Sequence, residues 1–137
     1  ARHGPLSFYG QLIERARRGE KWVIPQGGDQ LNDAVYVGDV GRSVICALKA
    51  EHSDVWQFNI GTGRAWTPRD FLNAAAKLFP KHQIELGPGP SSLGRSKQSY
   101  CIFDISAARK HLGYEPAYDV ERGVRDYVAT LDRLGRE

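Results

Sequence analysis

Apolar side chains recur at intervals of three and four residues in several stretches of this chain, which is the spacing of one face of an amphipathic helix. The clearest stretches run from Leu6 to Ala16, from Val40 to Leu48 and from Val120 to Leu134. Gly19 follows the first stretch at a position that suits the end of a helix. The pattern therefore predicts three helices, each with one apolar face.

Signals at the ends of elements predict two further helices. Thr67, Pro68 and Asp70 have the residue types of a helix N-cap, a first position and a third position. Either Asp104 or Ser106 has the residue type to cap a second, shorter helix. The predicted ends of these two helices are about Phe79 and just before Gly113.

Short runs of β-branched and aromatic residues predict strands between the helices. The predicted strands are residues 22–24, 35–37, 55–60 and 84–86, and the third places Trp56, Phe58 and Ile60 on one face. No linker or repeat interrupts this order. We therefore predict the fold class α/β, a mixed small domain of about five helices and short strands, with residues 1–137 as a single domain.

The composition fits a soluble globular domain and excludes several functional classes. The chain has 137 residues and a net charge of +3, and no apolar run approaches the roughly 20 residues of a membrane span, so we predict no membrane partner. Basic residues gather near the end of the first predicted helix, where the helix dipole favours cations. No aromatic platform accompanies them, so we predict no nucleic-acid partner. These basic residues are Arg15, Arg17, Arg18 and Lys21.

Cysteine and histidine usage narrows the chemistry further. Cys46 and Cys101 are far apart, which predicts reduced thiols and a cytoplasmic protein. The 4 histidines lack the spacing of metal ligands, so no metal site is predicted. Because the sequence contains no methionine, we expect that Ala1 is not the encoded start, and that the chain is either processed or part of a longer protein.

The stretch Gly27–Val44 reads G-G-D-Q-L-N-D-A-V-Y-V-G-D-V-G-R-S-V and predicts a turn, the strand 35–37, and a helix from Val40 that Asp39 caps. It resembles the pattern G-D-G-x-Q-x-R-D-x-V-Y-V-x-D-V of the extended short-chain dehydrogenase/reductases, the NAD-dependent epimerase/dehydratase family. The motifs F-N-I-G-T-G from Phe58 and L-G-Y-x-P from Leu112 resemble two more of this family's signatures.

Two family motifs are missing from the chain. The family binds NAD(P) through a G-x-x-G-x-x-G loop that lets the pyrophosphate approach a helix N-terminus, whereas the Gly61–Gly63 turn is followed by Arg64 and Ala65. None of the 6 tyrosines has a lysine four residues on, as the family's Y-x-x-x-K base requires. The chain thus resembles the C-terminal substrate-binding part of the family without its N-terminal Rossmann half. We predict no catalytic residues and no cofactor bound by this chain alone, with NAD(P) implied for a complete parent enzyme.

The resemblance implies cationic residues that hold the diphosphate of a nucleotide-sugar, because charge and bidentate geometry favour arginine there. The first family arginine is replaced by Asn32, whose amide can donate a hydrogen bond to a phosphate but cannot neutralise it. The second is Arg95 or, nearby, Lys97, in the irregular loop 87–97. For Arg95 the alternative is a solvated loop charge.

Two further groups of residues are implied as substrate contacts. Trp22, Val23 and Ile24 match a strand whose backbone lies beside the base or sugar, and the alternative is simple core packing. Tyr100 and Cys101 match a place that lines the sugar pocket, where a small cysteine leaves room. Cys101 has no nearby histidine in the sequence, so it is not predicted to be a nucleophile.

Two functions follow as predictions. The first is the substrate-binding portion of an NAD(P)-dependent sugar epimerase/dehydratase-like protein, an isomerase or dehydratase when complete but not catalytic alone. The alternative is a free-standing, non-enzymatic module that binds a sugar phosphate or a partner protein. The expected partners are a nucleotide-sugar or other sugar-derived small molecule, a separate Rossmann-type half, and a second copy, through the surface near 55–60 that a missing half would cover.

Overall fold

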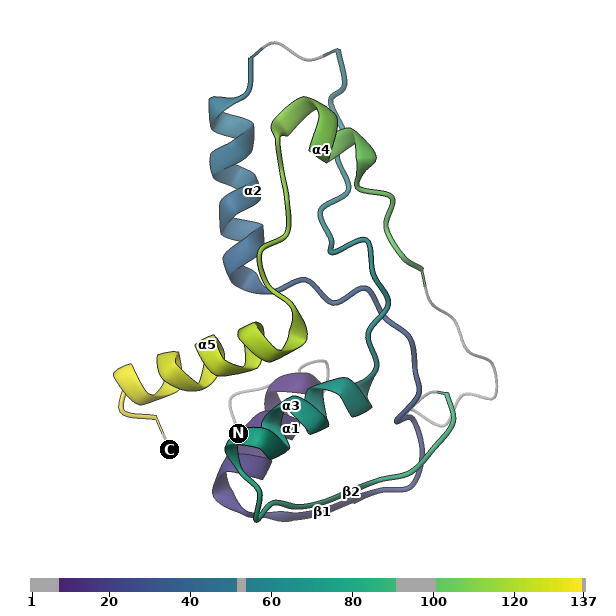
Figure 1. Cartoon of the computed structure of the whole chain (residues 1–137), viewed down its shortest axis with the longest axis vertical. Helices are drawn as coiled ribbons and strands as arrows, with labels where there is room; N and C mark the ends of the chain where they lie inside the picture. The colour runs from purple at the N-terminus through teal and green to yellow at the C-terminus, as the bar shows by residue number, and fades with distance from the viewer. Residues whose placement is uncertain (1–7, 52–53, 91–100, 137) are drawn as a thin grey trace. The chain divides into compact units, whose positions relative to one another are not determined.

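The computed structural model describes residues 8–51, 54–90 and 101–136, which contain five helices and one two-stranded parallel sheet (Figure 1). This confirms the predicted mixed α/β class. In chain order the elements are α1 (Phe8–Arg18), β1 (Lys21–Ile24), α2 (Val37–Lys49), α3 (Pro68–Leu78), β2 (Gln83–Leu86), α4 (Ser106–Leu112) and α5 (Val120–Arg133).

The described residues fall into two compact units, each made of segments distant in the sequence. The first unit holds α1, β1, α3, β2 and α5, and the second holds α2, α4 and the extended segments beside them. The organisation of the chain as a single domain stays a prediction. The first unit consists of residues 8–31, 67–90 and 120–136, and the second of residues 32–51, 54–66 and 101–119.

The first unit packs helices around a parallel strand pair. In the sheet, Trp22 lies opposite Ile84 and Ile24 lies opposite Leu86. Helix α3 packs against both α1 and α5, so the apolar faces of the three helices meet. The predicted periodicity of α1 and α5 is confirmed, because the buried positions follow the helical spacing. The core side chains of this unit include Leu12, Ile13, Ile24, Leu72, Ala75, Ile84, Val124 and Leu131.

The predicted start of α3 is confirmed in detail. The Thr67 hydroxyl accepts a hydrogen bond from the backbone N–H of Asp70 (3.3 Å), and the Asp70 carboxylate accepts one from the backbone N–H of Thr67 (2.8 Å). This reciprocal capping box satisfies two backbone donors that the helix itself leaves unpaired. Pro68 occupies the first helical position, as expected.

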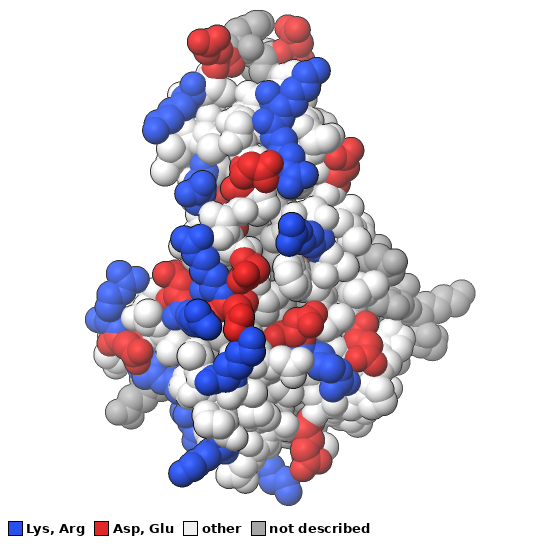
Figure 2. Space-filling model, viewed as in Figure 1, with Lys and Arg blue, Asp and Glu red and all other residues white. Residues whose placement is uncertain are grey.

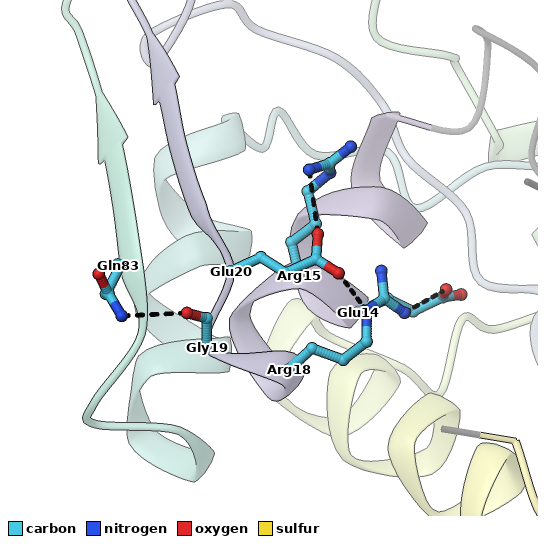
Figure 3. A network of polar contacts seen from close by, with 6 residues as sticks. All are labelled: Glu14, Arg15, Arg18, Gly19, Glu20 and Gln83. Carbon is cyan, nitrogen blue, oxygen red and sulfur yellow. Dashed lines mark hydrogen bonds and ion pairs between the residues drawn. The ribbon is translucent and has the colours of Figure 1, made fainter.

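The basic end of α1 is neutralised by carboxylates (Figure 3). Glu20 accepts from Arg15 at 3.0 Å and from Arg18 at 2.6 Å, and Arg18 also reaches Glu14 at 3.4 Å. Gly19 ends the helix with φ of 65°, and its carbonyl accepts a hydrogen bond from the Gln83 side chain of β2. Figure 2 likewise shows both charge signs interspersed on the face in view. The cations near the end of α1 therefore do not form an open basic patch.

The second unit has a small core of its own around α4. Tyr114, Ala108 and Ile105 are buried, with Phe58 and Ile60 packed against them. Gly113 ends α4 in the left-handed conformation, with φ of 64°. The N-cap residue of α4 is Ile105, but the Asp104 carboxylate accepts the backbone N–H of Ser106 at 2.9 Å and so supplies the predicted polar partner.

The predicted strand at residues 35–37 is wrong, and α2 begins one turn earlier than predicted. Tyr36 is the N-cap, and its carbonyl accepts hydrogen bonds from Asp39 N (2.9 Å) and Val40 N (3.2 Å). Asp39 therefore lies inside the first turn rather than at the cap. A triplet of β-branched and aromatic residues such as 35–37 forms a strand only where a neighbouring strand supplies hydrogen bonds, and no strand among the described residues lies beside it in a sheet.

The predicted strand at residues 55–60 is also absent from the described part of the chain, whose paired strands are β1 and β2. The segment is extended but irregular. Phe58 and Ile60 turn toward the core of the second unit, whereas Trp56 is 85% exposed. The Asn59 side chain donates to the Asp104 carbonyl at 3.2 Å, which fixes this segment beside the chain leading to α4.

Candidate functional site

In the first unit, β1 presents its three candidate side chains in different environments. Ile24 is buried in the core, so the core-packing interpretation holds for its side chain. The Trp22 ring lies 5.7 Å from the Phe8 ring, and the Arg15 guanidinium carbon lies 4.9 Å from the Trp22 centroid. Val23 is 54% exposed. Of the three side chains, Val23 therefore has the largest exposed fraction.

The loops that follow β1 and β2 are bound to each other at the carboxyl ends of the two strands. The backbone N–H groups of Gly27 and Gly28 donate to the carbonyls of Pro88 (3.2 Å) and Gly87 (3.0 Å). A Cβ atom on Gly87 would lie 2.0 Å from the Pro25 carbonyl oxygen. Only glycine permits this approach. The two loops, residues 25–28 and 87–89, therefore form one fixed surface, which we call the platform. The carboxyl ends of parallel strands are where open α/β sheets bind ligands.

Arg69 of α3 fastens this platform, and sequence reasoning did not single it out. Its Nε atom donates to the Asp29 carboxylate at 3.2 Å, and its Nη1 atom donates to the Leu86 carbonyl at 3.4 Å. Asp29 also accepts the Gly89 N–H at 2.8 Å. The Gly89 hydrogen bond, with the Arg69 hydrogen bond second, holds the pKa of Asp29 below its ordinary value. An arginine in the first turn of a helix opposes the helix dipole. The position of Arg69 in the sequence was therefore the signal that could have indicated a specific carboxylate partner.

In the second unit, Asn32 lies in an antiparallel bridge with Trp66. The Asn32 N–H donates to the Trp66 carbonyl at 2.9 Å, and the Trp66 N–H donates to the Asn32 carbonyl at 2.8 Å. Trp66 lines a pocket of about 210 Å³ together with Arg64, Thr62 and Tyr118. The structure thus places Asn32 opposite a pocket-lining residue.

Asp33 organises the turn that follows the 55–60 segment. Its carboxylate accepts the N–H of Thr62 (2.8 Å), the hydroxyl of Thr62 (2.7 Å), the N–H of Gly63 (3.1 Å) and the N–H of Phe103 (3.1 Å). A Cβ atom on Gly61 would lie 2.8 Å from the same carboxylate. Asp33 therefore fixes two distant segments, one of which begins beside the candidate residue Cys101.

The Gly61–Gly63 turn does not fit the pyrophosphate of a dinucleotide. Such a turn binds phosphate by aiming backbone N–H groups at it. Here the N–H groups of Thr62 and Gly63 already donate to Asp33. The Gly61 carbonyl accepts a hydrogen bond from the Tyr114 hydroxyl at 3.0 Å. This turn is therefore a structural junction of the second unit.

Two buried polar side chains in the second unit make hydrogen bonds within that unit. The Asp39 carboxylate is fully buried and accepts the N–H groups of Ala117 (2.8 Å) and Tyr118 (3.0 Å). Burial, followed by the charges of Asp39 and Asp33, raises the pKa of Tyr114 to about 12. A tyrosine with so high a pKa stays protonated near neutral pH and is a poor general base.

Of the remaining predicted substrate-binding residues, some lie in the described part of the chain and others do not. Cys101 is exposed and is a free cysteine, and its place in a sugar pocket stays a prediction. Arg95, Lys97 and Tyr100 lie outside the described residues.

Among the described residues, no group of three metal-ligating side chains could hold an ion. None of the helices there has the length and apolar character needed to cross a membrane.

No protein-family model matches the chain, but solved structures resemble it closely. UDP-glucose 4-epimerase from Thermotoga maritima, solved with UDP-glucose, is 28% identical with a TM-score of 0.76, and the match covers 98% of this chain and 42% of the epimerase. UDP-glucuronic acid 4-epimerase from Bacillus cereus, solved with NAD, is 25% identical with a TM-score of 0.68, covering 95% of this chain and 41% of that chain.

A third neighbour shares the fold at lower identity. UDP-N-acetylglucosamine 4-epimerase from Bacillus cereus is 22% identical with a TM-score of 0.73, and the match covers 90% of this chain and 42% of the epimerase. The chain therefore spans about two fifths of the length of these enzymes. The order of motifs in the sequence and the structural matches agree, and the chain has the fold of part of an extended short-chain dehydrogenase/reductase of the sugar-epimerase type.

Proposed function

We propose that this chain is the substrate-binding portion of an NAD(P)-dependent nucleotide-sugar epimerase/dehydratase-like protein and that it is not catalytic alone. The observation that carries the proposal is the platform at the carboxyl ends of β1 and β2. The glycine contacts at residues 28 and 87, with the Arg69–Asp29 pair, hold that platform in one conformation. A preformed site loses less free energy to ordering when a ligand binds.

The exposed edge of β1 supports a role in ligand contact. The strand pairs with β2 on one side, and among the described residues no strand pairs with its other edge. Backbone N–H and C=O groups along such an edge can hydrogen-bond a base or sugar. The exposed Val23 side chain adds apolar surface at the same strand. In our proposal, the backbone of residues 22–24 lies beside the nucleotide-sugar.

The diphosphate requires cationic partners, for which Arg95 and Lys97 remain the proposed residues. Asn32 contributes at most a neutral hydrogen bond at the position where the family has arginine. Tyr100 and Cys101 are proposed to line the sugar pocket. Because the Gly61–Gly63 turn already donates to Asp33, we propose that hydride chemistry requires a separate Rossmann-type half that supplies NAD(P).

Isothermal titration calorimetry of the chain with UDP-glucose tests the proposal. We expect saturable binding with Kd near or below about 1 mM, which corresponds to about 4 kcal/mol, and no saturable binding of NAD or NADP in the same range. Arg95→Ala should weaken UDP-glucose binding by about 1.5–3 kcal/mol, the range for a hydrogen bond to a charged group. Arg136→Ala, which removes an exposed cation after α5, is the matched control and should leave binding unchanged.

Several outcomes would contradict the proposal. Absence of UDP-glucose binding at millimolar ligand would remove the substrate-binding role. Equal affinity of the Arg95→Ala and Arg136→Ala variants would return Arg95 to a solvated loop charge. Tight binding of NAD would show that the cofactor site lies in this chain.

A free-standing interaction module is the second candidate, and a specific observation favours it. Trp56 and the outer face of α2 expose large apolar side chains, as expected of a surface that meets another protein. The encoding gene discriminates the two candidates. An upstream reading frame with G-x-x-G-x-x-G and Y-x-x-x-K supports the enzyme, whereas an initiation codon directly before Ala1 supports the module. Cytoplasmic location and self-association remain proposals for either.

A further inference from the structure

The pocket beside Trp66 lies wholly within the second unit. Its volume is about 210 Å³, whereas pockets that take a whole drug-sized ligand measure about 300–1,000 Å³. The pocket therefore suits one chemical group of a ligand rather than an entire nucleotide-sugar. Its lining comes from the turn after Gly61, from α4 and from the segment after α4, and includes Arg64, Trp66, Arg109, Glu115, Tyr118 and Asp119.

Hydrogen bonds fix the walls of this pocket. Trp66 is held by two backbone hydrogen bonds with Asn32, at 2.8 and 2.9 Å. In the segment after α4, the Tyr118 N–H donates to the fully buried Asp39 carboxylate at 3.0 Å, and the Tyr118 ring lies 4.7 Å from the Tyr36 ring. A pocket whose walls are already ordered loses less free energy when a ligand binds.

Three side chains of the lining carry N–H donors that are available to a ligand. The Arg64 guanidinium makes no hydrogen bond or ion pair with the described residues, and its printed partners are all at its backbone. The Trp66 indole N–H also has no acceptor in the described part of the chain. Arg109 binds Glu115 through Nε at 2.7 Å and through Nη2 at 3.2 Å, so its Nη1 atom remains for another acceptor. Such a set of donors favours an anionic group.

The charges of the lining set the expected strength of binding. Glu115 is neutralised by Arg109, so Arg64 is the cation that no ion pair within the described residues balances. Asp119 also lines the pocket and brings its formal net charge to zero. We therefore expect an affinity in the millimolar range for an isolated anion.

We propose that this pocket binds a phosphate group and that Arg64 is its cation. A phosphate presents more acceptor oxygens than a carboxylate does, so it suits donors from three side chains. The planar fork of a guanidinium matches two of those oxygens.

The position of Asn32 connects this pocket with the proposed substrate. Asn32 lies directly opposite Trp66 in their antiparallel bridge, and side chains of directly opposite residues share one face with Cβ atoms about 5 Å apart. Arg64, two positions before Trp66, then supplies the positive charge that Asn32 lacks. The assignment to the diphosphate of a nucleotide-sugar rests on the proposed function, whereas the phosphate pocket itself does not.

The Trp66 indole N–H provides a local signal in a nitrogen-15 NMR titration of the chain, and Trp66→Phe assigns its resonance. Sodium phosphate up to about 20 mM, with the ionic strength held constant by sodium chloride, should shift this resonance saturably with a Kd of about 1–10 mM. The indole resonances of Trp22 and Trp56 should not move. Sodium acetate at the same ionic strength should cause a smaller shift.

Variants of Arg64 test its role. Arg64→Ala should lose the saturable shift of the Trp66 resonance. Arg64→Lys keeps the charge without the fork and should weaken phosphate binding about threefold or more. Arg136→Ala, which removes an exposed cation after α5, is the control and should leave the titration unchanged.

UDP-glucose and uridine distinguish the two sources of the phosphate. If the pocket holds the diphosphate of a nucleotide-sugar, UDP-glucose shifts the Trp66 resonance, uridine does not, and Arg64→Ala weakens UDP-glucose binding about tenfold or more. If the pocket holds free phosphate, inorganic phosphate shifts the resonance and UDP-glucose does not. Both results support the phosphate pocket.

Three results would overturn the inference. The first is a Trp66 resonance that neither phosphate nor UDP-glucose moves. The second is an equal shift in the wild type and in Arg64→Ala, because phosphate would then bind without Arg64. The third is an acetate shift as large as the phosphate shift, which would exclude a pocket selective for phosphate. Absence of UDP-glucose binding together with an Arg64-dependent phosphate shift would contradict the proposed function and support this inference.

Discussion

The carboxylate of Asp33 binds Thr62 twice, through its backbone N–H at 2.8 Å and through its hydroxyl at 2.7 Å. The two residues are 29 positions apart in the chain. Together with the bonds to Gly63 and Phe103, this contact joins three segments of the second unit. A single side chain thus keeps these three segments together, beside the backbone bridge between Asn32 and Trp66.

Replacing Asp33 by alanine should destabilise the protein by about 2–4 kcal/mol, because several donors lose a charged acceptor in a half-buried place. Urea unfolding followed by circular dichroism measures this as a lower midpoint at unchanged slope. Glu51→Ala, at an exposed position, should change stability by no more than about 0.5 kcal/mol. If Asp33→Ala lowers the free energy of unfolding by no more than Glu51→Ala does, water replaces the carboxylate as the hydrogen-bond acceptor.

The Tyr114 hydroxyl should ionise later than an ordinary tyrosine. Its pKa is raised to about 12 in the folded protein, whereas an unfolded tyrosine has a pKa of about 10. The folded state therefore holds this proton more tightly than the unfolded state does. The contribution of the protonated Tyr114 hydroxyl to the free energy of unfolding is complete below pH 10 and is lost as the pH rises through 12. Spectrophotometric titration of the wild type against Tyr114→Phe isolates the phenolate signal.

Near-identical titration curves for the wild type and Tyr114→Phe up to about pH 11, with a difference only above it, are the expected result. A difference already developed at pH 10 would contradict the buried hydroxyl. In addition, Tyr114→Phe should cost about 0.5–1.5 kcal/mol at neutral pH, because the Gly61 carbonyl loses its donor.

The capping box of α3 gives a prediction about helix stability. Thr67→Ala should cost about 1 kcal/mol, since the N–H of Asp70 loses its acceptor. Asn73→Ala, at an exposed position in the middle of the same helix, should be neutral or stabilising by up to about 0.5 kcal/mol through helix propensity. Thermal unfolding of both variants provides the comparison, and an equal effect of the two substitutions would refute the capping role.

The platform after β1 and β2 should not tolerate a side chain at Gly87. A Cβ atom there would lie 2.0 Å from a backbone oxygen, so Gly87→Ala should destabilise by about 1–3 kcal/mol as the loops move apart. The same substitution at Gly41 meets open space inside a helix, and it should stabilise the protein by about 0.5–1 kcal/mol. Chemical denaturation of the two alanine variants measures both changes in stability. If Gly87→Ala also reduces UDP-glucose affinity, the platform contributes to binding.

Local chemistry in the sequence was sufficient to predict those helices and strands whose ends are set by nearby residues. The Thr67–Asp70 box, the glycine ends of α1 and α4, and the strand at residues 22–24 were all predicted from signals within a few residues. These signals work because a cap or a φ restriction acts within one turn of the chain. The family resemblance likewise followed from motif order, and the structural matches confirm it.

Tertiary structure decided what the local pattern could not. Residues 35–37 and 55–60 have strand-like composition, but a strand exists only when another segment offers its backbone, and no described residue does so. The direction in which α2 faces was set by Asp39 reaching Ala117, 78 residues away, and not by the valines that mark its periodicity. The Arg69–Asp29 pair arose in the same way, between residues 40 apart. The sequence alone determined the order of the helices, most of their ends and which family the chain resembles, whereas the long-range hydrogen bonds of the buried Asp39 carboxylate determined which face of α2 is covered, because their partners are chosen by the fold.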